Sequence, residues 1–289
     1  MSFLVDATTR VVIQGITGVL GTFVTDMMVD HGLAPVAGVT PGRGGESIRG
    51  VPVFDTVHAA MLESGATSSL VLVPASGLLD AVLEAIESGI SPIVLMVDGV
   101  PLALSEELLL AARTAGVTVI GPNSPGVISP GQCLLGALHP AKFIPGDIAV
   151  ISRSGGMMST IAHTLADAGF GTSTCLGIGG DSVIGLDMSA AVMLAQGDDE
   201  SRAIVIFGEI GTTQEERLAT LVASGAITKP VIAYIAGAAA PEGIRYSHAG
   251  AQADGAVGSA EAKKRSLASS GVHVVDRYVD IPAVLATIR

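Results

Sequence analysis

Ten short segments rich in valine and isoleucine recur along the chain, and stretches of helical length separate most of them. The segments are apolar at consecutive positions, which is typical of strands covered on both faces. Strands of this kind form parallel sheets between layers of helices, so the alternation predicts a doubly wound α/β fold. The predicted strands are residues 10–15, 34–39, 68–74, 91–97, 117–122, 147–152, 172–178, 203–208, 230–236 and 272–276.

Two of the helical stretches carry start signals. Ser105 precedes two glutamates, so we predict that it caps a helix that ends before Gly116. The run from Thr212 to Glu215 has the spacing of a capping box and predicts another helix start.

The spacing of the strands also predicts two domains. Five strands have passed by Pro122, and the next 24 residues, 123–146, hold four prolines and four glycines. Such a composition is typical of a connection between domains. We therefore expect one α/β domain at residues 1–124 and a second at 125–289.

Charge and composition restrict the partners. The formal net charge is −12 and the basic residues are scattered, which argues against nucleic acid or an anionic membrane as the main partner. The sequence has no apolar run near the ~18 residues that span a bilayer and no leader-like start, so we expect a cytoplasmic protein. Cys133 and Cys175 lack metal-ligand spacing, which indicates free thiols and no metal site in this chain.

The first strand runs into a glycine-rich turn. Gly15, Gly18 and Gly21 stand at a predicted strand-to-helix junction, where backbone amides can approach a phosphate. Their spacing differs from the usual dinucleotide fingerprint, so a tight turn without a ligand is the alternative. After the second strand comes Arg43 and no carboxylate, which favours NADP or coenzyme A over NAD. The chain contains no P-loop sequence.

Three strands of the second half end in polar loops. The turn at 153–156, Glu209 and a loop with Arg245 and His248 follow the strands at 147–152, 203–208 and 230–236. Parallel strands bring such loops to one edge of the sheet, where open α/β folds bind ligands. We therefore expect a carboxylate, a histidine and an anion-binding turn to converge there.

His248 is the candidate nucleophile at this edge. Glu209 would accept a hydrogen bond from one ring nitrogen and leave the other free. Ser154, Gly155 and Gly156 open a helix, whose first amides suit a phosphoryl group. An ordinary loop histidine is the alternative. Arg245 would contact phosphate or carboxylate, or simply be solvated.

Over essentially its whole length the chain resembles the alpha subunits of succinyl-CoA synthetase, which are nucleoside-diphosphate-forming acyl-CoA ligases. The matching motifs keep the family's order and spacing: QGITGVLGTF, GVTPGRGG, GVPVFDTV, IGPNSPGVISPG, ISRSGG, GFGTSTCLGIGGD, GEIG, KPVIAYIAG and SHAGA. The resemblance implies a CoA-binding Rossmann-like domain followed by a flavodoxin-like ligase domain. It also implies that His248 is phosphorylated and that Glu209 hydrogen-bonds its ring.

The resemblance implies a reaction in three steps. An NTP, bound with Mg²⁺ on a separate ATP-grasp beta subunit, phosphorylates His248. The phosphoryl group passes to a small carboxylic acid, and the thiol of coenzyme A then attacks the acyl phosphate. The subunits would assemble as αβ or α2β2. Carried over by position, the CoA contacts are Thr17, Gly18, Val19, Leu20, Arg43, Met96, Val97 and Asp98.

Some positions depart from the family pattern. Val19 and Leu20 replace a usual Ser-Gln, Arg43 replaces a lysine, and Ser124 replaces a cysteine. The acid-binding turn runs from Ser154 as SGGMMS, with Ser159 where the family has a tyrosine, and is similar to that of ATP-citrate lyase and citryl-CoA synthetase.

These departures leave alternatives open. The smaller turn predicts a wider acid pocket, so the acid would be citrate, malate or another dicarboxylate in place of succinate. Two other classes would share the fold: an NADP-dependent oxidoreductase, and a non-catalytic CoA-binding module. Neither accounts for a glutamate opposite a histidine loop.

Overall fold

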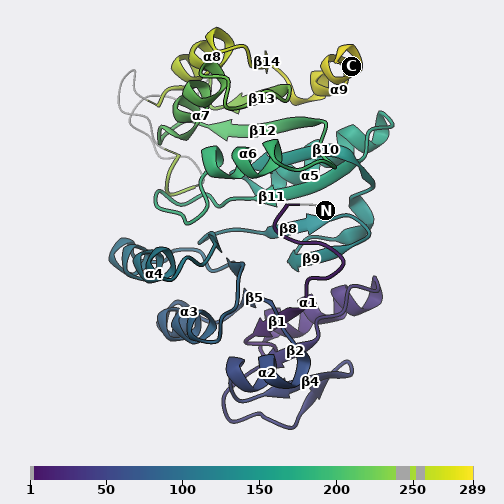
Figure 1. Cartoon of the computed structure of the whole chain (residues 1–289), viewed down its shortest axis with the longest axis vertical. Coiled ribbons are helices and arrows are strands. Elements are labelled where there is room, and N and C mark those ends of the chain that lie inside the picture. The colour runs from purple at the N-terminus through teal and green to yellow at the C-terminus, as the bar shows by residue number, and fades with distance from the viewer. Residues whose placement is uncertain (1–2, 239–247, 252–257, 289) are drawn as a thin grey trace.

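The computed structural model describes residues 3–238, 248–251 and 258–288. Within these ranges the strands form two seven-stranded sheets, and the two halves of the chain are stacked along the long axis (Figure 1). Each of the ten predicted segments contains a strand, and the α/β prediction is confirmed.

The first sheet has the strand order of a Rossmann fold. Its order is β3-β4-β2-β1-β5-β6-β7, and all pairs are parallel except β3–β4. The strands are β1 (Val11–Gln14), β2 (Ala37–Val39), β3 (Ser47–Ile48), β4 (Val51–Phe54), β5 (Ser68–Val71), β6 (Ile93–Leu95) and β7 (Val119–Ile120). Without the short β3, this is the 3-2-1-4-5-6 order, in which the winding reverses between β1 and β5.

Four helices of the first half accompany this sheet in the described residues: α1 (Val19–Asp30), α2 (Val57–Ser64), α3 (Leu78–Glu87) and α4 (Leu102–Ala115), with a 3₁₀ turn, η1 (Ala75–Gly77), before α3. The predicted cap at Ser105 is wrong. Helix α4 begins at Leu102, because Pro101, four residues before Ser105 and with φ −57°, is the N-cap residue; its carbonyl accepts the N–H of Ser105. The predicted end is confirmed, with Gly116 in the left-handed region at φ 70°.

The second sheet has a flavodoxin-like core. Its order is β14-β13-β12-β10-β11-β8-β9. The strands are β8 (Gly126–Ser129), β9 (Cys133–Gly136), β10 (Pro145–Ser152), β11 (Thr172–Gly177), β12 (Ala203–Glu209), β13 (Val231–Ala236) and β14 (His273–Val275). Counted from β10, the parallel strands follow the 2-1-3-4-5 order, and the winding reverses between β10 and β12.

The segment expected to be a plain connection contains a β-hairpin. Strands β8 and β9 pair with each other, and β8 pairs antiparallel with β11, so both belong to the second sheet. Pro130 and Gly131 form the turn between the two strands, whereas Gly126 and Gly136 lie within the strands themselves. The strand residues themselves are buried. The expected boundary at 124/125 remains a prediction.

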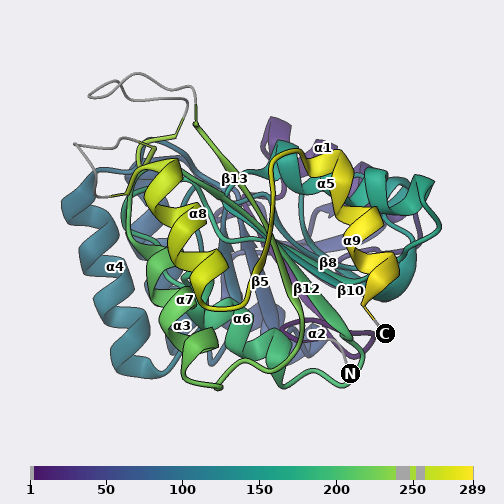
Figure 2. The same ribbon diagram turned by 90° about the horizontal axis from the view of Figure 1, so that it is seen from above.

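Helices cover both faces of the second sheet. They are α5 (Gly155–Asp167), α6 (Met188–Gln196), α7 (Gln214–Ala223), α8 (Ala260–Ser269) and α9 (Ile281–Thr287), with 3₁₀ turns η2 (Pro140–Lys142) and η3 (Tyr278–Asp280). Seen from above, α6, α7 and α8 lie on one side of the sheet, and α5 and α9 lie on the other (Figure 2).

The capping box predicted at the start of α7 is wrong. Thr213 is the N-cap residue, and Glu215 is fully buried. The Glu215 carboxylate pairs with the buried ammonium of Lys263 on α8 and accepts the backbone N–H of Glu209 at 3.2 Å. The buried Glu215 carboxylate needs a counter-charge. Lys263 supplies that charge, whereas the backbone N–H of a capping box would not.

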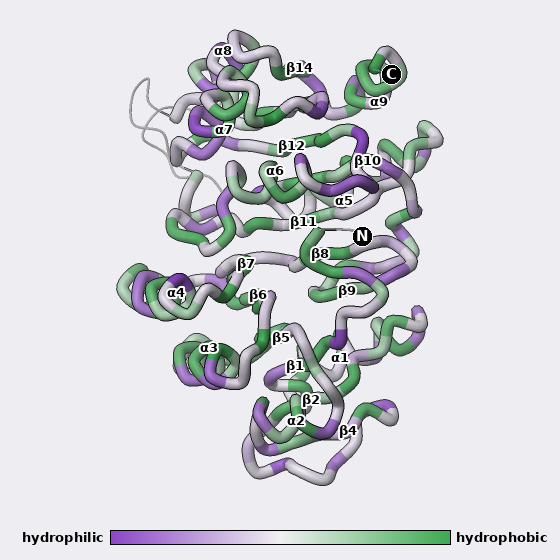
Figure 3. The backbone as a smooth tube through the Cα atoms, in the orientation of Figure 1, coloured by the Kyte–Doolittle hydropathy of each residue, from purple (hydrophilic) through white to green (hydrophobic). Residues whose placement is uncertain are grey.

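A hydrophobic core runs through both halves, and a second cluster of buried residues lies within the first half. The buried members of the shared core include Ile13 and Ile120 of the first sheet and Val127 and Ile151 of the second, and the hydrophobic strands stand out in Figure 3. The Ser129 hydroxyl also donates to the Val5 carbonyl across the junction, at 2.7 Å. No helix within the described ranges is long and apolar enough to cross a membrane.

Candidate active site

The candidate site lies at the reversal point of the second sheet. Strands β10, β12 and β13 are parallel neighbours, and the register pairs Ser152 with Phe207 and Glu209 with Ala236. The turn after β10 therefore begins beside the end of β12, and the Arg153 N–H donates to the Phe207 carbonyl at 3.3 Å. Open α/β sheets form their ligand crevice at this place.

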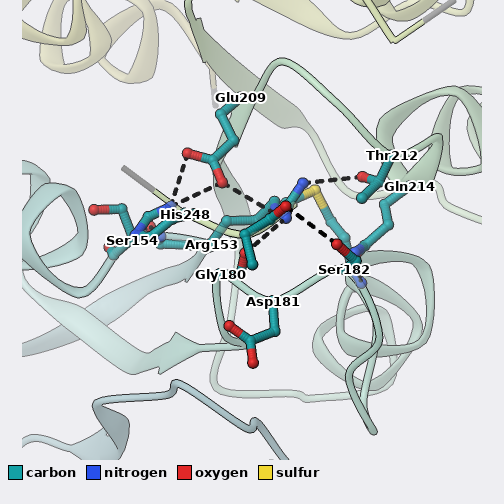
Figure 4. A network of polar contacts seen from close by, with 12 residues as sticks. Arg153, Ser154, Gly180, Asp181, Ser182, Glu209, Thr212, Gln214 and His248 are labelled. Carbon is teal, nitrogen blue, oxygen red and sulfur yellow. Dashed lines mark hydrogen bonds and ion pairs between the residues drawn. The ribbon is translucent and has the colours of Figure 1, made fainter. Parts of the chain in front are cut away.

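His248 and Glu209 meet there, as the sequence predicts. The imidazole Nδ1 lies 2.9 Å from Oε1 and 3.0 Å from Oε2 of Glu209 (Figure 4). The side chain of Glu209 is 10% exposed and that of His248 is 21% exposed, so the pair is largely shielded while the ring still reaches solvent. A carboxylate oxygen accepts hydrogen bonds, so in a neutral imidazole this contact would place the proton on Nδ1 and the lone pair on Nε2.

Arg153 completes the site, and sequence reasoning did not assign it a role. Its side chain is fully buried, with Nε 3.4 Å from Oε1 of Glu209. Nη1 donates to the Thr212 hydroxyl at 2.9 Å and Nη2 donates to the Gly180 carbonyl at 3.3 Å. The signal in the sequence was a cation immediately after a buried strand, at the start of the anion-binding turn.

The turn that carries Glu209 is held from two sides. Thr212 has φ 51°, a left-handed conformation that costs a non-glycine residue free energy. Its hydroxyl accepts from Arg153, and its carbonyl accepts from Lys263 Nζ at 3.2 Å. These two buried cations stabilise the unusual turn, and with it the end of β12.

The loop after β11 forms the floor beneath the imidazole. The Gly180 carbonyl accepts the Gly250 N–H at 3.1 Å, which ties this loop to the residues after His248. A Cβ on Gly180 would lie 2.5 Å from Cγ and Cδ2 of the His248 ring. The same loop holds Asp181, which accepts from Asn123 Nδ2 at 3.0 Å and points away from Arg153 in Figure 4.

The predicted anion-binding turn opens α5. Ser154 is the N-cap residue, and its hydroxyl accepts the Met157 N–H at 3.3 Å. Gly155 and Gly156 occupy the first turn, whose N–H groups lack acceptors within a helix. Ser159, one turn further, donates its hydroxyl to the Gly155 carbonyl at 3.2 Å. Arg245 lies outside the described residues.

The first domain has a cavity of about 620 Å³ at its own reversal point. Its walls come from the ends of β1, β2 and β5 and from α3. The lining residues are Gln14, Gly15, Thr17, Gly18, Val39, Thr40, Pro41, Leu72, Val73, Pro74, Gly77, Asp80, Ala81 and Glu84. Two of the predicted CoA contacts, Thr17 and Gly18, are therefore cavity residues. Asp80 and Glu84 were not predicted, because they lie on a helix and follow no strand end.

The other predicted CoA contacts lie outside this described lining. Val19 and Leu20 start α1 and are 93% and 45% exposed. Met96, Val97 and Asp98 follow β6, one strand beyond β5.

Arg43 is exposed and pairs with Glu46, with 2.7 Å between Nη2 and Oε2. The hydrogen bond from Arg43 lowers the pKa of the Glu46 carboxyl. The Arg43 guanidinium is therefore paired with an exposed carboxylate.

The cysteines are poor candidates for a nucleophile. Cys133 and Cys175 are buried free thiols, and burial raises the pKa of each to about 12. A thiol that stays protonated at neutral pH is weakly nucleophilic. His248 is thus the better candidate for a nucleophile.

Two family models match separate parts of the chain. The CoA binding domain family matches residues 6–99, and the CoA-ligase family matches residues 151–273. The fold and the site thus define a ligase-class chain built on a CoA-binding domain. The chain belongs to the family of the alpha subunits of ADP-forming succinate–CoA ligases.

Two relatives document that membership. Subunit alpha 2 of succinate–CoA ligase from Archaeoglobus fulgidus is 43% identical over 288 residues, which cover 100% of both chains. The alpha subunit from Aquifex aeolicus is 40% identical and covers 100% of this chain and 95% of its own.

Solved structures share the fold. The ATP citrate lyase of Methanothrix soehngenii, in complex with citrate and coenzyme A, superposes with a TM-score of 0.88 at 22% identity over 98% of this chain. A dinucleotide-forming acetyl-coenzyme A synthetase from Ca. Korarchaeum cryptofilum gives 0.77 at 18% identity over 97%. This chain spans 50% and 61% of those longer chains.

We predict that Gly180→Ala displaces the His248 ring. The new methyl group would overlap the ring, and overpacking of this kind costs about 1–3 kcal/mol unless the neighbour moves. A crystal structure of the variant should show Nδ1 beyond hydrogen-bond distance of Glu209. Gly197→Ala is the matched control, because its nearest neighbour would lie at an ordinary 3.6 Å. An unmoved ring in an equally stable Gly180→Ala protein contradicts the prediction.

Proposed function

We propose that this chain is the alpha subunit of a nucleoside-diphosphate-forming acid–CoA ligase in which His248 carries the phosphoryl group. The observation that supports this most directly is the bond from Nδ1 to both oxygens of Glu209. It leaves Nε2 as the nucleophilic atom and places a negative charge beside the ring. That charge stabilises the cation that forms when Nε2 attacks phosphorus.

In the first step Nε2 attacks the terminal phosphorus of an NTP. A new N–P bond forms, the bond to the bridging oxygen breaks, and NDP leaves. The proton on Nδ1 stays in its bond to Glu209. We infer that the NTP and its Mg²⁺ are bound by an ATP-grasp beta subunit, since this chain has no P-loop sequence of its own.

In the next two steps the phosphoryl group serves to activate an acid. A carboxylate oxygen attacks phosphorus, the N–P bond breaks, and the imidazole regains its lone pair as the acyl phosphate forms. The sulfur of coenzyme A then attacks the acyl carbon, phosphate leaves, and the thiol proton goes to the phosphate. Ser154 and the first-turn amides of Gly155 and Gly156 are suited to binding the phosphoryl group.

Coenzyme A would bind in the first domain. The cavity at the end of β1 is bordered by Thr17 and Gly18, and the exposed Arg43 lies two residues beyond its wall at Pro41. We infer that Val19 and Leu20 contribute backbone contacts and that Met96, Val97 and Asp98 contact the far end of the ligand.

The acid itself has two candidates. The relatives are named for succinate. Ser159 favours a second candidate, a larger or hydroxylated acid such as citrate or malate. The side chain of Ser159 is smaller than the family's tyrosine, and its hydroxyl bonds within its own helix.

We predict that His248→Asn abolishes phosphorylation and that Glu209→Gln slows it roughly 100-fold, because the amide lacks the charge that stabilises the transition state. The assay incubates the complex of this chain and its beta subunit with NTP labelled in the terminal phosphate and measures acid-labile label on the chain. His58→Asn, at an exposed position of α2, is the control. Label retained by His248→Asn would exclude the mechanism.

We predict that Arg43→Ala weakens binding of coenzyme A about 10-fold but leaves that of 3′-dephospho-CoA within about twofold. The reason is that Arg43 would meet the ribose phosphate, which only the first ligand carries. Glu46→Gln should strengthen CoA binding slightly by releasing the guanidinium. Calorimetric titration measures both ligands. Equal losses for both would contradict the assignment.

We predict that citrate or malate is used with a kcat/KM of at least about one tenth of that for succinate, and that Ser159→Tyr shifts the preference toward succinate roughly tenfold, since a few contacts in a pocket have this effect. The measurement is acyl-CoA formation with a panel of acids. A preference of the unaltered enzyme for succinate by a wide margin contradicts the wider pocket.

A further inference from the structure

Arg153 is a cation buried where the sheet meets the site. Arg153 is among the largest fully buried side chains of the described residues, and the residue is only 1% exposed. Two of its nitrogens have acceptors, whereas Nε has no hydrogen-bond partner among the described residues. The nearest carboxylate atom is Oε1 of Glu209, at 3.4 Å.

A purely structural role, in which Arg153 joins two loops by hydrogen bonds, does not explain this arrangement. A neutral donor would satisfy the Thr212 hydroxyl and the Gly180 carbonyl equally well and would avoid burying a charge. A buried donor without an acceptor is unfavourable and calls for a physical reason. The reason that the geometry offers is the carboxylate beside it, because both oxygens of Glu209 are turned toward His248 and the charge still needs compensation.

We propose that Arg153 is a positioning residue for phosphoryl transfer: its charge fixes the Glu209 carboxylate as the acceptor of the His248 Nδ1–H, and so selects Nε2 as the phosphorylated atom. This inference rests on the proposed function. Arg153 acts through Glu209 and does not itself touch the reacting atoms.

The space around the guanidinium is fitted to that role. A Cβ on Gly250 would lie 2.4 Å from Nη2, so the loop that carries His248 packs directly against Arg153. Gly180 contacts both, because its carbonyl accepts from Nη2 and its Cα faces the imidazole. The guanidinium, the carboxylate and the ring are therefore fixed relative to one another by close backbone contacts.

The charged groups around Glu209 are few. In the described part of the chain its carboxylate meets Arg153 and His248, while Glu215 bonds its backbone N–H and is itself neutralised by Lys263. Removal of Arg153 would thus leave the carboxylate with the imidazole as its remaining partner.

The test combines truncation with chemical rescue. In the complex with the beta subunit, His248 of the Arg153→Ala variant should be phosphorylated about 100-fold more slowly than His248 of the unaltered chain. The reason is that the buried Glu209 carboxylate loses its cationic partner. Guanidinium added at millimolar concentration should raise the phosphorylation rate of the variant about tenfold or more. Urea has the same planar shape without the charge and should leave that rate unchanged. Rescue by both, or a rate within about twofold of the unaltered chain, would overturn the proposal.

A second readout does not depend on turnover. Long-range ¹H–¹⁵N spectra of the histidines, assigned with His248→Asn, should show His248 protonated at Nδ1. In Arg153→Ala a substantial fraction should be protonated at Nε2, and ³¹P spectra of the phosphorylated variant should show the Nδ1 isomer beside the Nε2 isomer. An unchanged tautomer and a single isomer would contradict the proposal.

Thr212→Val keeps the test usable if the truncated chain does not fold. It removes one hydrogen bond that aims Arg153 but leaves the charge, so we expect about 3- to 10-fold slower phosphorylation and a partial tautomer shift. The control is Thr172→Val, which alters a buried threonine at the opposite end of β11. It should change neither the rate of phosphorylation nor the tautomer of His248. If the unaltered complex takes up no phosphate, the proposed function fails, and the tautomer comparison still decides the role of Arg153.

Discussion

A buried carboxylate organises the second half of this protein. Glu209 ends a fully buried strand, and its charge must be compensated where water is largely excluded. The compensation comes from Arg153 on one side and from the imidazole N–H on the other, and each of these donors is fixed by its own contacts. The fold thereby holds the His248 imidazole with Nδ1 against the carboxylate.

Chain topology explains why the partners meet. In both sheets the winding reverses between two adjacent strands, and the loops that leave them diverge to opposite faces, which opens a crevice. The first sheet has its cavity between the ends of β1 and β5, and the second has Arg153 and Glu209 after β10 and β12. The same reversal of winding therefore produces the ligand-sized cavity in the first sheet and the cluster around His248 in the second.

The sequence is informative where the physics is local or periodic. Strands buried on both faces leave an apolar signature, so all ten predicted segments contain strands, and glycine-rich turns point to the carboxyl edges. The convergence of His248 and Glu209 follows from the parallel arrangement of neighbouring strands.

Long-range pairing leaves no such signature. The hairpin β8–β9 was hidden because its turns contain proline and glycine, while its strands gain stability from β11, about 45 residues further on. Glu215 has the spacing of a cap, but Lys263, far along the chain, offers a stronger partner. The sequence shows an arginine at position 153 but does not indicate that it is buried, because a cation in a turn is usually solvated. Its burial depends on Thr212 and Gly180, which arrive from two other loops.

The two sites must also cooperate, and the short segment between the sheets provides the physical link. Gly121 and Asn123 follow the last strand of the first sheet, and their carbonyls accept the N–H groups of Gly185 and Gly180. The Asn123 amide adds its bond to Asp181. Because Gly180 also contacts Arg153 and the His248 ring, the floor of the histidine site is bonded directly to the exit of the CoA-binding domain. In the proposed reaction the acyl phosphate formed beside His248 must meet the thiol of coenzyme A, so the placement of the two domains relative to each other matters. These backbone bonds, made where the chain leaves one sheet for the other, are placed to maintain it.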